Sequence, residues 1–241
     1  NGRLFLKPDH VTTQAVTVRL PTFDESACTG CRKCVEFCRF NALVYVKNRP
    51  MVFSEVCHSC GGCGLVCPVG AVSEAEKPVG TVEWGQRGDI RVVTGCMNPG
   101  EASGIPVIQA ALSQAAAVDE LTVIDCPPGS ACSVMESVQR ADYCVLVAEP
   151  TAFGLHNFEM VYELVTLLHK PCGVVVNKAD GGCAALDDFC KQQSVTVLRR
   201  IPYSEKLAEL GAKGIVAAEA DKEAAELFGG LLADIRKEAR P

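Results

Sequence analysis

The 241-residue sequence predicts an α/β protein in which a doubly wound, mostly parallel sheet carries a smaller inserted α+β domain. Two observations lead to this prediction. A cysteine-rich stretch occupies residues 21–76, and from about residue 80 short β-branched runs alternate with amphipathic stretches. Strands that alternate with helical crossovers are typical of a parallel sheet with helices on its faces.

Each element follows from its local pattern. Residues 1–20 form a lead-in segment of the larger domain, which resumes after the cysteine-rich domain of residues 21–76 and occupies residues 77–241. Apolar, β-branched runs bounded by turn residues predict strands at 90–94, 121–124, 143–148, 173–176 and 195–199. Amphipathic patterns predict helices at 104–117, 132–140, 155–169, 184–193, 204–211 and 221–239.

The composition narrows the class of protein. Hydrophobic residues make up 48% and aromatic residues 6% of the sequence, so small aliphatic side chains fill the core, as in a buried parallel sheet. The net charge of −6 offers no basic stripe, so we expect no nucleic-acid partner. No integral membrane segment or signal peptide is recognisable. Together with 15 cysteines, this favours the reducing cytoplasm of an anaerobe.

Two cysteine runs repeat at an interval of 29 residues. The spacing, CxxCxxCxxxC, is the one by which bacterial ferredoxins hold [4Fe–4S] clusters, with the fourth cysteine of each run binding the other cluster. We therefore predict a bacterial-ferredoxin-like domain with two [4Fe–4S] clusters. The first cluster is expected on Cys28, Cys31, Cys34 and Cys67, and the second on Cys57, Cys60, Cys63 and Cys38.

Zinc is the alternative metal for these cysteines, because paired CxxC units also bind zinc. Zinc sites usually pair two such units across a longer gap, so the interleaved repeat favours iron–sulfur clusters. Arg39 follows Cys38 where the ferredoxin pattern has proline, whereas Pro68 follows Cys67. Arg39 either raises the potential of the nearby cluster or is simply solvated.

Polar residues follow three of the predicted strands in the larger domain. Asp125 ends an apolar run and is followed by Cys-Pro-Pro-Gly129, as for a carboxylate that holds Mg²⁺ beside a nucleotide phosphate. An ordinary strand-to-turn junction is the alternative. Asn177 and Asp180 end a later strand, at the edge where such sheets read nucleotide bases, and Tyr203 follows the next strand.

Four motifs together resemble the MinD/ParA-type P-loop ATPases. They are Asp-x-Pro-Pro-Gly from Asp125, Glu-Pro-Thr-x-Phe-Gly-Leu-His from Glu149, Val-Val-Asn-Lys-Ala-Asp up to Asp180, and Arg-Ile-Pro-Tyr up to Tyr203. The sequence is similar to the branch of that family that carries an inserted two-cluster ferredoxin domain, which is related to the nitrogenase iron protein and the Mrp-type iron–sulfur carriers. The resemblance covers essentially the whole chain.

The resemblance implies a P-loop NTPase-like fold, with ATP and Mg²⁺ as cofactors of a full-length parent. It implies that Asp125, as the catalytic Walker B carboxylate, and Gly129 hold the magnesium and γ-phosphate side of the site. It also implies that Asn177 contacts the base, that Pro202 and Tyr203 line its pocket, and that Asp180 shares this edge.

One motif of the family does not occur in this sequence, namely the loop Gly-x-Gly-Gly-x-Gly-Lys-[Ser/Thr]. The opening residues, Asn-Gly-Arg-Leu-Phe-Leu, are similar to a segment that follows the second strand in the family. We therefore expect a domain that lacks its first strand, helix and second strand. Since the loop supplies most of the phosphate cradle, this chain should bind ATP weakly or not at all, whereas a full-length parent would be an ATPase.

The leading functional hypothesis is nucleotide-linked electron transfer through the two clusters to a redox partner. The protein would act as a homodimer or be paired with a related ATPase. The alternatives are a carrier that delivers clusters or metals to an apo-protein acceptor, and a plain ferredoxin-type electron carrier. Cys132 either binds a third, shared cluster, together with Cys126, or is an idle thiol.

Overall fold

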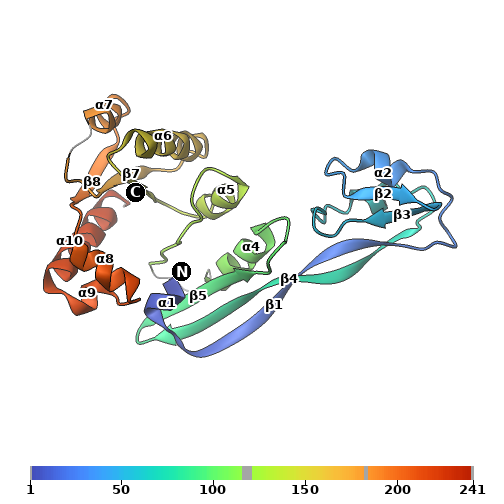
Figure 1. Ribbon diagram of the computed structural model, residues 1–241, viewed down its shortest axis with the longest axis horizontal. Coiled ribbons are helices and arrows are strands. Elements are labelled where there is room, and N and C mark those ends of the chain that lie inside the picture. The colour runs from blue at the N-terminus through green and yellow to red at the C-terminus, as the bar shows by residue number, and fades with distance from the viewer. Residues whose placement is uncertain (1, 116–120, 182–183, 240–241) are drawn as a thin grey trace. The chain divides into compact units, whose positions relative to one another are not determined.

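The computed structural model describes residues 2–115, 121–181 and 184–239. The chain divides into two compact units, one of residues Pro8–Glu120 and one of Asn1–Lys7 with Leu121–Pro241. Figure 1 shows the order of the elements along the chain. Each unit has its own sheet and its own apolar core.

The unit Pro8–Glu120 is built on a three-stranded antiparallel sheet. Its strands are β1 (Asp9–Phe23), β4 (Val72–Arg87) and β5 (Ile90–Met97), in the order β1-β4-β5. β1 and β4 pair along nearly their whole length, down to Phe23 opposite Val72. They form a two-stranded ribbon that ends at the cysteine-rich segment (Figure 1).

Helix α4 (Ile105–Ala115) covers one face of this sheet through Val107, which packs with Val16, Val79 and Val82 in a small core. The close approach requires a residue without a side chain at Gly80. A Cβ atom there would lie 2.9 Å from the Val107 side chain and 2.3 Å from the backbone oxygen of Cys96.

The cysteine-rich segment between β1 and β4 folds as two similar halves. The first contains α2 (Lys33–Phe37) and β2 (Leu43–Val46), and the second contains β3 (Arg49–Val52) and α3 (Gly62–Leu65). The 29-residue repeat of the sequence recurs in the pairing of the strands. Leu43 lies opposite Val52, and the equivalent residues, Val72 and Phe23, also lie opposite each other.

Backbone hydrogen bonds obey the same symmetry. The N–H of Asp24 donates to the carbonyl of Ala71 at 2.9 Å, and the N–H of the equivalent Phe53 donates to the carbonyl of Ala42 at 2.8 Å. Each bond joins one half to the other, so the two halves are related by an approximate two-fold axis. Ala42 and Ala71 are almost completely buried, which explains why a small residue recurs there.

The second unit contains a three-stranded parallel sheet. Its strands are β6 (Cys144–Ala148), β7 (Cys172–Asn177) and β8 (Thr196–Ile201), in the order β6-β7-β8. Its helices are α1 (Gly2–Leu6), α5 (Cys132–Val138), α6 (Ala152–Leu167), α7 (Ala184–Gln192), α8 (Glu205–Ala212), α9 (Ala217–Ala220) and α10 (Lys222–Glu238).

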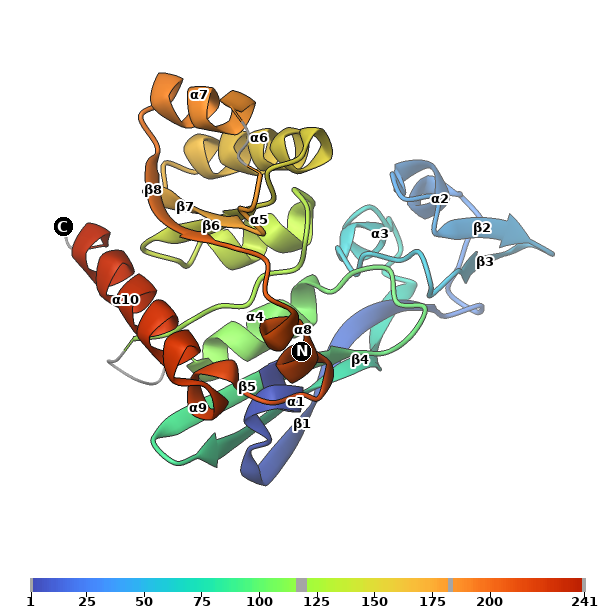
Figure 2. The same cartoon turned by 60° about the vertical axis from the view of Figure 1, so that its left-hand side comes forward.

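Helices cover both faces of this sheet. On one face, Val174 and Val176 of β7 pack with Phe158 of α6 and with residues of α5 and α7. On the other face, Val175 joins a cluster that includes Leu207 of α8 and apolar residues of α10. Figure 2 shows α6 and α10 on opposite sides of the strands. A parallel sheet between two layers of helices is doubly wound, so the predicted fold class is confirmed.

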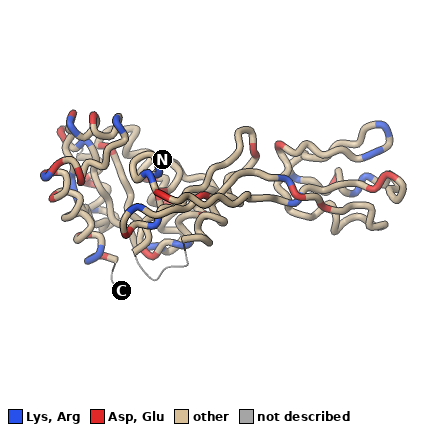
Figure 3. The backbone as a smooth tube through the Cα atoms, turned by 90° about the horizontal axis from the view of Figure 1, so that it is seen from below, with Lys and Arg blue, Asp and Glu red and all other residues tan. Residues whose placement is uncertain are grey.

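Most of the predicted elements are present in the described residues. The strands expected at 143–148, 173–176 and 195–199 are β6, β7 and β8, and a helix lies in each of the six expected ranges. Residues 116–117, at the end of the first expected helix, lie outside the described residues. Among the described helices, none is both long enough and apolar enough to cross a membrane. Acidic and basic positions are interspersed along the chain (Figure 3).

Two strand predictions were wrong in whole or in part. Residues 121–124 form no strand, and the side chains of Leu121 and Val123 are 55% and 82% exposed. An apolar run becomes a strand only if a neighbour pairs with it, and sequence pattern alone does not supply that neighbour. Residues 90–94 do form part of β5, but β5 lies in the antiparallel sheet, because Gly88 and Asp89 join it to β4 as a two-residue hairpin turn.

The compact units also differ from the predicted boundaries at residues 20 and 76. β1 and β4 each run across one of these boundaries, and residues 77–120 belong with the cysteine-rich segment. The physical reason is that the strands leading into and out of the cysteine-rich segment pair with each other.

Candidate metal centres

One cavity of the Pro8–Glu120 unit is lined by the four cysteines predicted to hold the first cluster. Cys28, Cys31 and Cys34 come from the chain before α2 and its first turn, whereas Cys67 comes from the turn after α3. The two-fold relation of the halves brings this distant fourth thiol to the other three. Much of the remaining wall of the cavity is apolar and includes Phe23, Val69 and Val72.

The second set of cysteines occupies the equivalent loop. Burial raises the pKa of the Cys63 thiol, and the nearby thiols of Cys57 and Cys60 raise it further. In the first half, burial and the neighbouring thiols of Cys31 and Cys28 likewise raise the pKa of Cys34. Cys38 stands in the first half where Cys67 stands in the second. Across the described residues, no three His, Cys, Asp or Glu side chains converge as ligands of one metal ion.

Backbone amides point at the fourth cysteine of each run. The N–H of Ala42 donates to Cys38 Sγ at 3.4 Å, and the N–H of Ala71 donates to Cys67 Sγ at 3.3 Å. Backbone N–H groups that donate to the Cys67 sulfur, first that of Val69 and then that of Ala71, hold the pKa of Cys67 below its usual value. Cluster ligands must be thiolates, so donors aimed at sulfur suit both cluster binding and the tuning of a potential. The donor set therefore fits the predicted [4Fe–4S] clusters.

Left-handed backbone at matching positions shapes the two loops. Arg32 has φ +61° and the equivalent Gly61 has φ +71°, and each precedes the short helix of its half. Gly30 has φ +71° and also needs to be glycine for space, because a Cβ atom would lie 2.4 Å from Tyr45 Oη. Tyr45 therefore lies directly against the loop that carries the first three cysteines.

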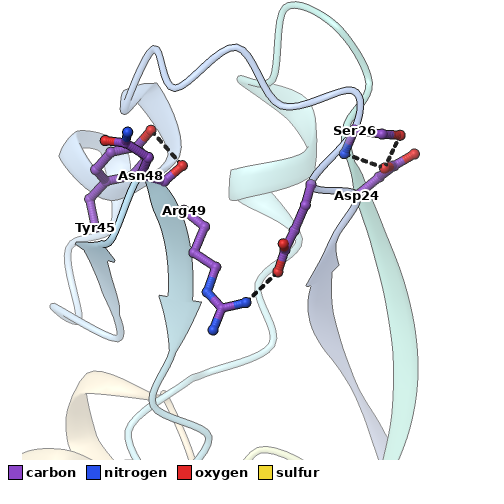
Figure 4. Close-up of polar contacts among 6 residues, drawn as sticks. Asp24, Ser26, Tyr45, Asn48 and Arg49 are labelled. Carbon is purple, nitrogen blue, oxygen red and sulfur yellow. Dashed lines mark hydrogen bonds and ion pairs between the residues drawn. The ribbon is translucent and has the colours of Figure 1, made fainter.

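Arg32 and Tyr45 both line the first cavity, and the Arg32 guanidinium carbon lies 4.7 Å from the centre of the Tyr45 ring. The Tyr45 hydroxyl donates to the carbonyl of Asn48 at 2.9 Å (Figure 4), which fixes the ring that supports the guanidinium. Sequence reasoning missed this pair. The residues are 13 positions apart, and only the β2–β3 hairpin brings the ring to the cysteine loop.

Two further polar contacts hold the start of the first cysteine loop. The side chain of Asp24 accepts hydrogen bonds from the backbone and hydroxyl of Ser26, at 2.9 and 2.6 Å. Glu25 pairs with Arg49 of β3 at 2.6 Å. Figure 4 shows both contacts. In the second half, His58 stacks on Phe40 with ring centres 4.0 Å apart.

The predicted base-binding residues of the α/β unit lie together at the ends of β7 and β8. Asn177 pairs with Ile201, and Asp180 Oδ2 accepts a hydrogen bond from the Tyr203 N–H at 2.8 Å. Pro202 lies between these partners in the chain. The adjacent Lys178 pairs with Glu149, which follows β6, at 2.6 Å. One edge of the sheet therefore gathers residues from three strand ends.

The predicted magnesium and phosphate residues lie in a segment without regular secondary structure. Asp125 follows the run that forms no strand, and Gly129 has φ +91° in the bend before α5. Cys132 is the first residue of α5, and both it and Cys126 are exposed.

A comparison with known families matches residues 27–72 to the 4Fe-4S dicluster domain. This match confirms that the cysteine-rich segment is of the two-cluster iron–sulfur type. It covers all eight predicted cluster cysteines.

Two curated proteins of Methanocaldococcus jannaschii are similar to this chain. The uncharacterized protein MJ0579 is 22% identical over 73% of this chain and 62% of its own length. The uncharacterized protein MJ0578 is 27% identical over 63% of this chain and 53% of its own length. The chain therefore spans between half and two thirds of the curated relatives it matches.

Two solved structures are also similar. The cell division ATPase MinD of Pyrococcus furiosus matches with a TM-score of 0.47 and 22% identity, over 54% of this chain and 57% of its own. The MinD cell division protein of Aquifex aeolicus matches with a TM-score of 0.46 and 18% identity, over 57% of this chain and 62% of its own.

Proposed function

We propose that this protein binds two [4Fe–4S] clusters and transfers single electrons through them to a redox partner. One observation carries the proposal. Cys67, separated in sequence from Cys28, Cys31 and Cys34, lines the same cavity as these three thiols. This is the interleaved ligand set that the cysteine spacing predicts for a two-cluster ferredoxin. The second cluster would be held by Cys57, Cys60, Cys63 and Cys38.

The residues of the protein have distinct tasks in this proposal. A [4Fe–4S] cluster, when bound, supplies a one-electron couple, and the thiolates fix its place in the chain. The amides of Ala42 and Ala71, which donate to sulfur, stabilise the negative charge of the thiolates. Apolar side chains such as Phe23 exclude water from the first cavity, which strengthens these electrostatic effects.

We also propose that nucleotide binding is linked to this electron transfer. Its support is the gathering of Asn177, Asp180 and Tyr203 at the carboxyl edge of a parallel sheet, where nucleotides bind in doubly wound folds. In a longer parent protein, Asp125 and Gly129 would serve the Mg²⁺ and phosphate side of ATP. The nucleotide state would then control access of the redox partner to the clusters.

Anaerobic reconstitution with iron and sulfide tests the two-cluster proposal. We expect about eight iron atoms per chain, with an EPR signal after reduction by dithionite, because two cubanes account for all eight predicted ligands. Replacement of Cys67→Ser should lower the iron content, since it removes one thiolate from the first cavity.

Cys132→Ser is the matched control, because Cys132 is exposed and lies outside the cluster domain. It should keep about eight irons, whereas a loss of iron would indicate a third cluster on this thiol. Rapid transfer of the clusters to an apo-protein, in place of reversible reduction, would contradict electron transfer and favour the carrier function.

A further inference from the structure

The two cluster sites have different charges at equivalent positions. Arg32 of the first half corresponds to Gly61 of the second half, and Tyr45 corresponds to Glu74, since each pair is 29 residues apart. The contacts correspond as well. Arg32 lies over the Tyr45 ring, and the position of a Cβ atom on Gly61 lies 3.4 Å from Glu74 Oε1. The first loop therefore carries a guanidinium where the second carries a carboxylate.

The guanidinium is well placed to act on the first site. Arg32 lies between Cys31 and Cys34 in the chain, and apart from the thiols and Tyr45 it is the only ionisable residue that lines the described cavity. The ring of Tyr45, anchored on Asn48, holds it there. A cation over an aromatic face is attracted by the ring, and the planar guanidinium is the cation that most often makes this contact.

The carboxylate of Glu74 faces the loop of the second site. Its nearest described cation is Arg19, at 3.7 Å, and the Arg19 side chain is 74% exposed. Solvent screens a pair of this kind strongly, so Arg19 cancels little of the negative charge. Lys33 precedes Cys34 and Arg39 follows Cys38, so one further cation is adjacent in sequence to a ligand of each site, and these two do not distinguish the sites.

We propose that Arg32 raises, and Glu74 lowers, the reduction potential of the adjacent cluster, so that the cluster on Cys28, Cys31, Cys34 and Cys67 is reduced first. A positive charge near a cluster favours the reduced, more negative state, and a carboxylate disfavours it. The proposal rests on the two-cluster function proposed above. It gives the electron a direction, from the second cluster to the first.

A redox titration of the reconstituted full-length chain, followed by EPR, tests this inference. The wild-type chain should reduce in two separate one-electron steps. Arg32→Gly should lower the higher step alone, with at least about a tenfold fall in the ratio of reduced to oxidised cluster at fixed potential, or ~59 mV. Glycine suits φ +61° and reproduces the residue of the second half, so the loop should keep its conformation.

Three further variants complete the test. Arg32→Lys should keep the higher potential, because the charge remains. Lys47→Asn removes a cation of the same domain that does not line the cavity, and should move neither step. Glu74→Gln should raise the lower step alone, and it gives an independent answer if Arg32→Gly loses iron.

Two results would overturn the inference: both steps unmoved in Arg32→Gly and in Glu74→Gln, or a movement of the opposite step in either variant. The failure of the proposed function looks different. In that case the wild-type chain itself would not reach about eight irons or would give no EPR signal on reduction.

Discussion

Single residues distinguish two halves that share one backbone plan. Equivalent positions keep the left-handed backbone, as at Arg32 and Gly61, but the side chains differ where the halves meet. Phe37 of α2 lies against Gly62 of α3, and Gly62 corresponds to Lys33 in the first half. An exact repeat would place a long side chain on the Phe37 ring, so this contact requires the asymmetry.

Gly62→Ala should destabilise the cluster domain. The new Cβ atom would lie 2.2 Å from the Phe37 ring, so this half-exposed ring must move away from α3, at a cost of about 1 kcal/mol, the low end of the range for overpacking. Gly64→Ala is the matched control, because it lies in the same short helix with nothing within 4 Å of its Cβ position. It should be neutral or stabilise by up to about 1 kcal/mol. Equal melting temperatures of the two reconstituted variants would contradict the packing argument.

Elements of the α/β unit are fixed at their ends by caps as well as by the core. The α10 helix begins after Asp221, whose side chain accepts a hydrogen bond from the Ala224 N–H at 3.3 Å and also pairs with Lys206 of α8. Asp221 thus both caps one helix and ties it to another. The hydrogen bond from Lys206 is the main cause that holds the pKa of Asp221 below its usual value.

Asp221→Ala should lower the melting temperature, because it removes both the cap and the ion pair. Asp221→Asn is the control, since asparagine caps helices well but cannot pair with Lys206. The lowered pKa gives the sign of the pH effect. The stability from the ion pair is present above the usual value of 3.8 and is lost as the pH falls through the lowered pKa.

The pH titration can be followed by circular dichroism of the wild-type and Asp221→Asn chains. The difference in stability between them should shrink as the pH falls below about 4. A difference that stays constant across this range would contradict a contribution from the ionised carboxylate.

Sequence pattern predicted elements well where one chain segment decides the outcome. The spacing of the cysteines predicted a two-cluster segment, which the family match over residues 27–72 confirms, and the apolar runs predicted β6, β7 and β8. Pattern failed where a distant partner decides. Residues 121–124 have the composition of a strand but no strand pairing, and Tyr45 reaches the cysteine loop only through a hairpin. Such contacts depend on tertiary structure, which periodicity does not report.

The whole molecule combines a two-cluster segment with a doubly wound unit, and these place different demands on the sequence. The cluster segment has all of its predicted ligands between residues 28 and 67. In the proposed nucleotide site, Asn177 and Tyr203 would serve the base side, whereas the phosphate side would rely on Asp125 and Gly129, in a segment without regular secondary structure. The chain therefore provides a more complete set of residues for cluster binding than for nucleotide binding.

This difference predicts that the 241-residue chain binds MgATP weakly or not at all. In P-loop proteins, backbone amides and a lysine of the loop cradle the phosphates, and no Gly-Lys-Ser or Gly-Lys-Thr occurs in this sequence. Asp180 already accepts the Tyr203 N–H, which uses part of its hydrogen-bonding capacity within the fold. Isothermal titration calorimetry on the reconstituted chain should give no saturable heat at micromolar MgATP. Micromolar binding that Asn177→Ala abolishes would contradict this expectation and would mean that the base edge suffices to hold the nucleotide.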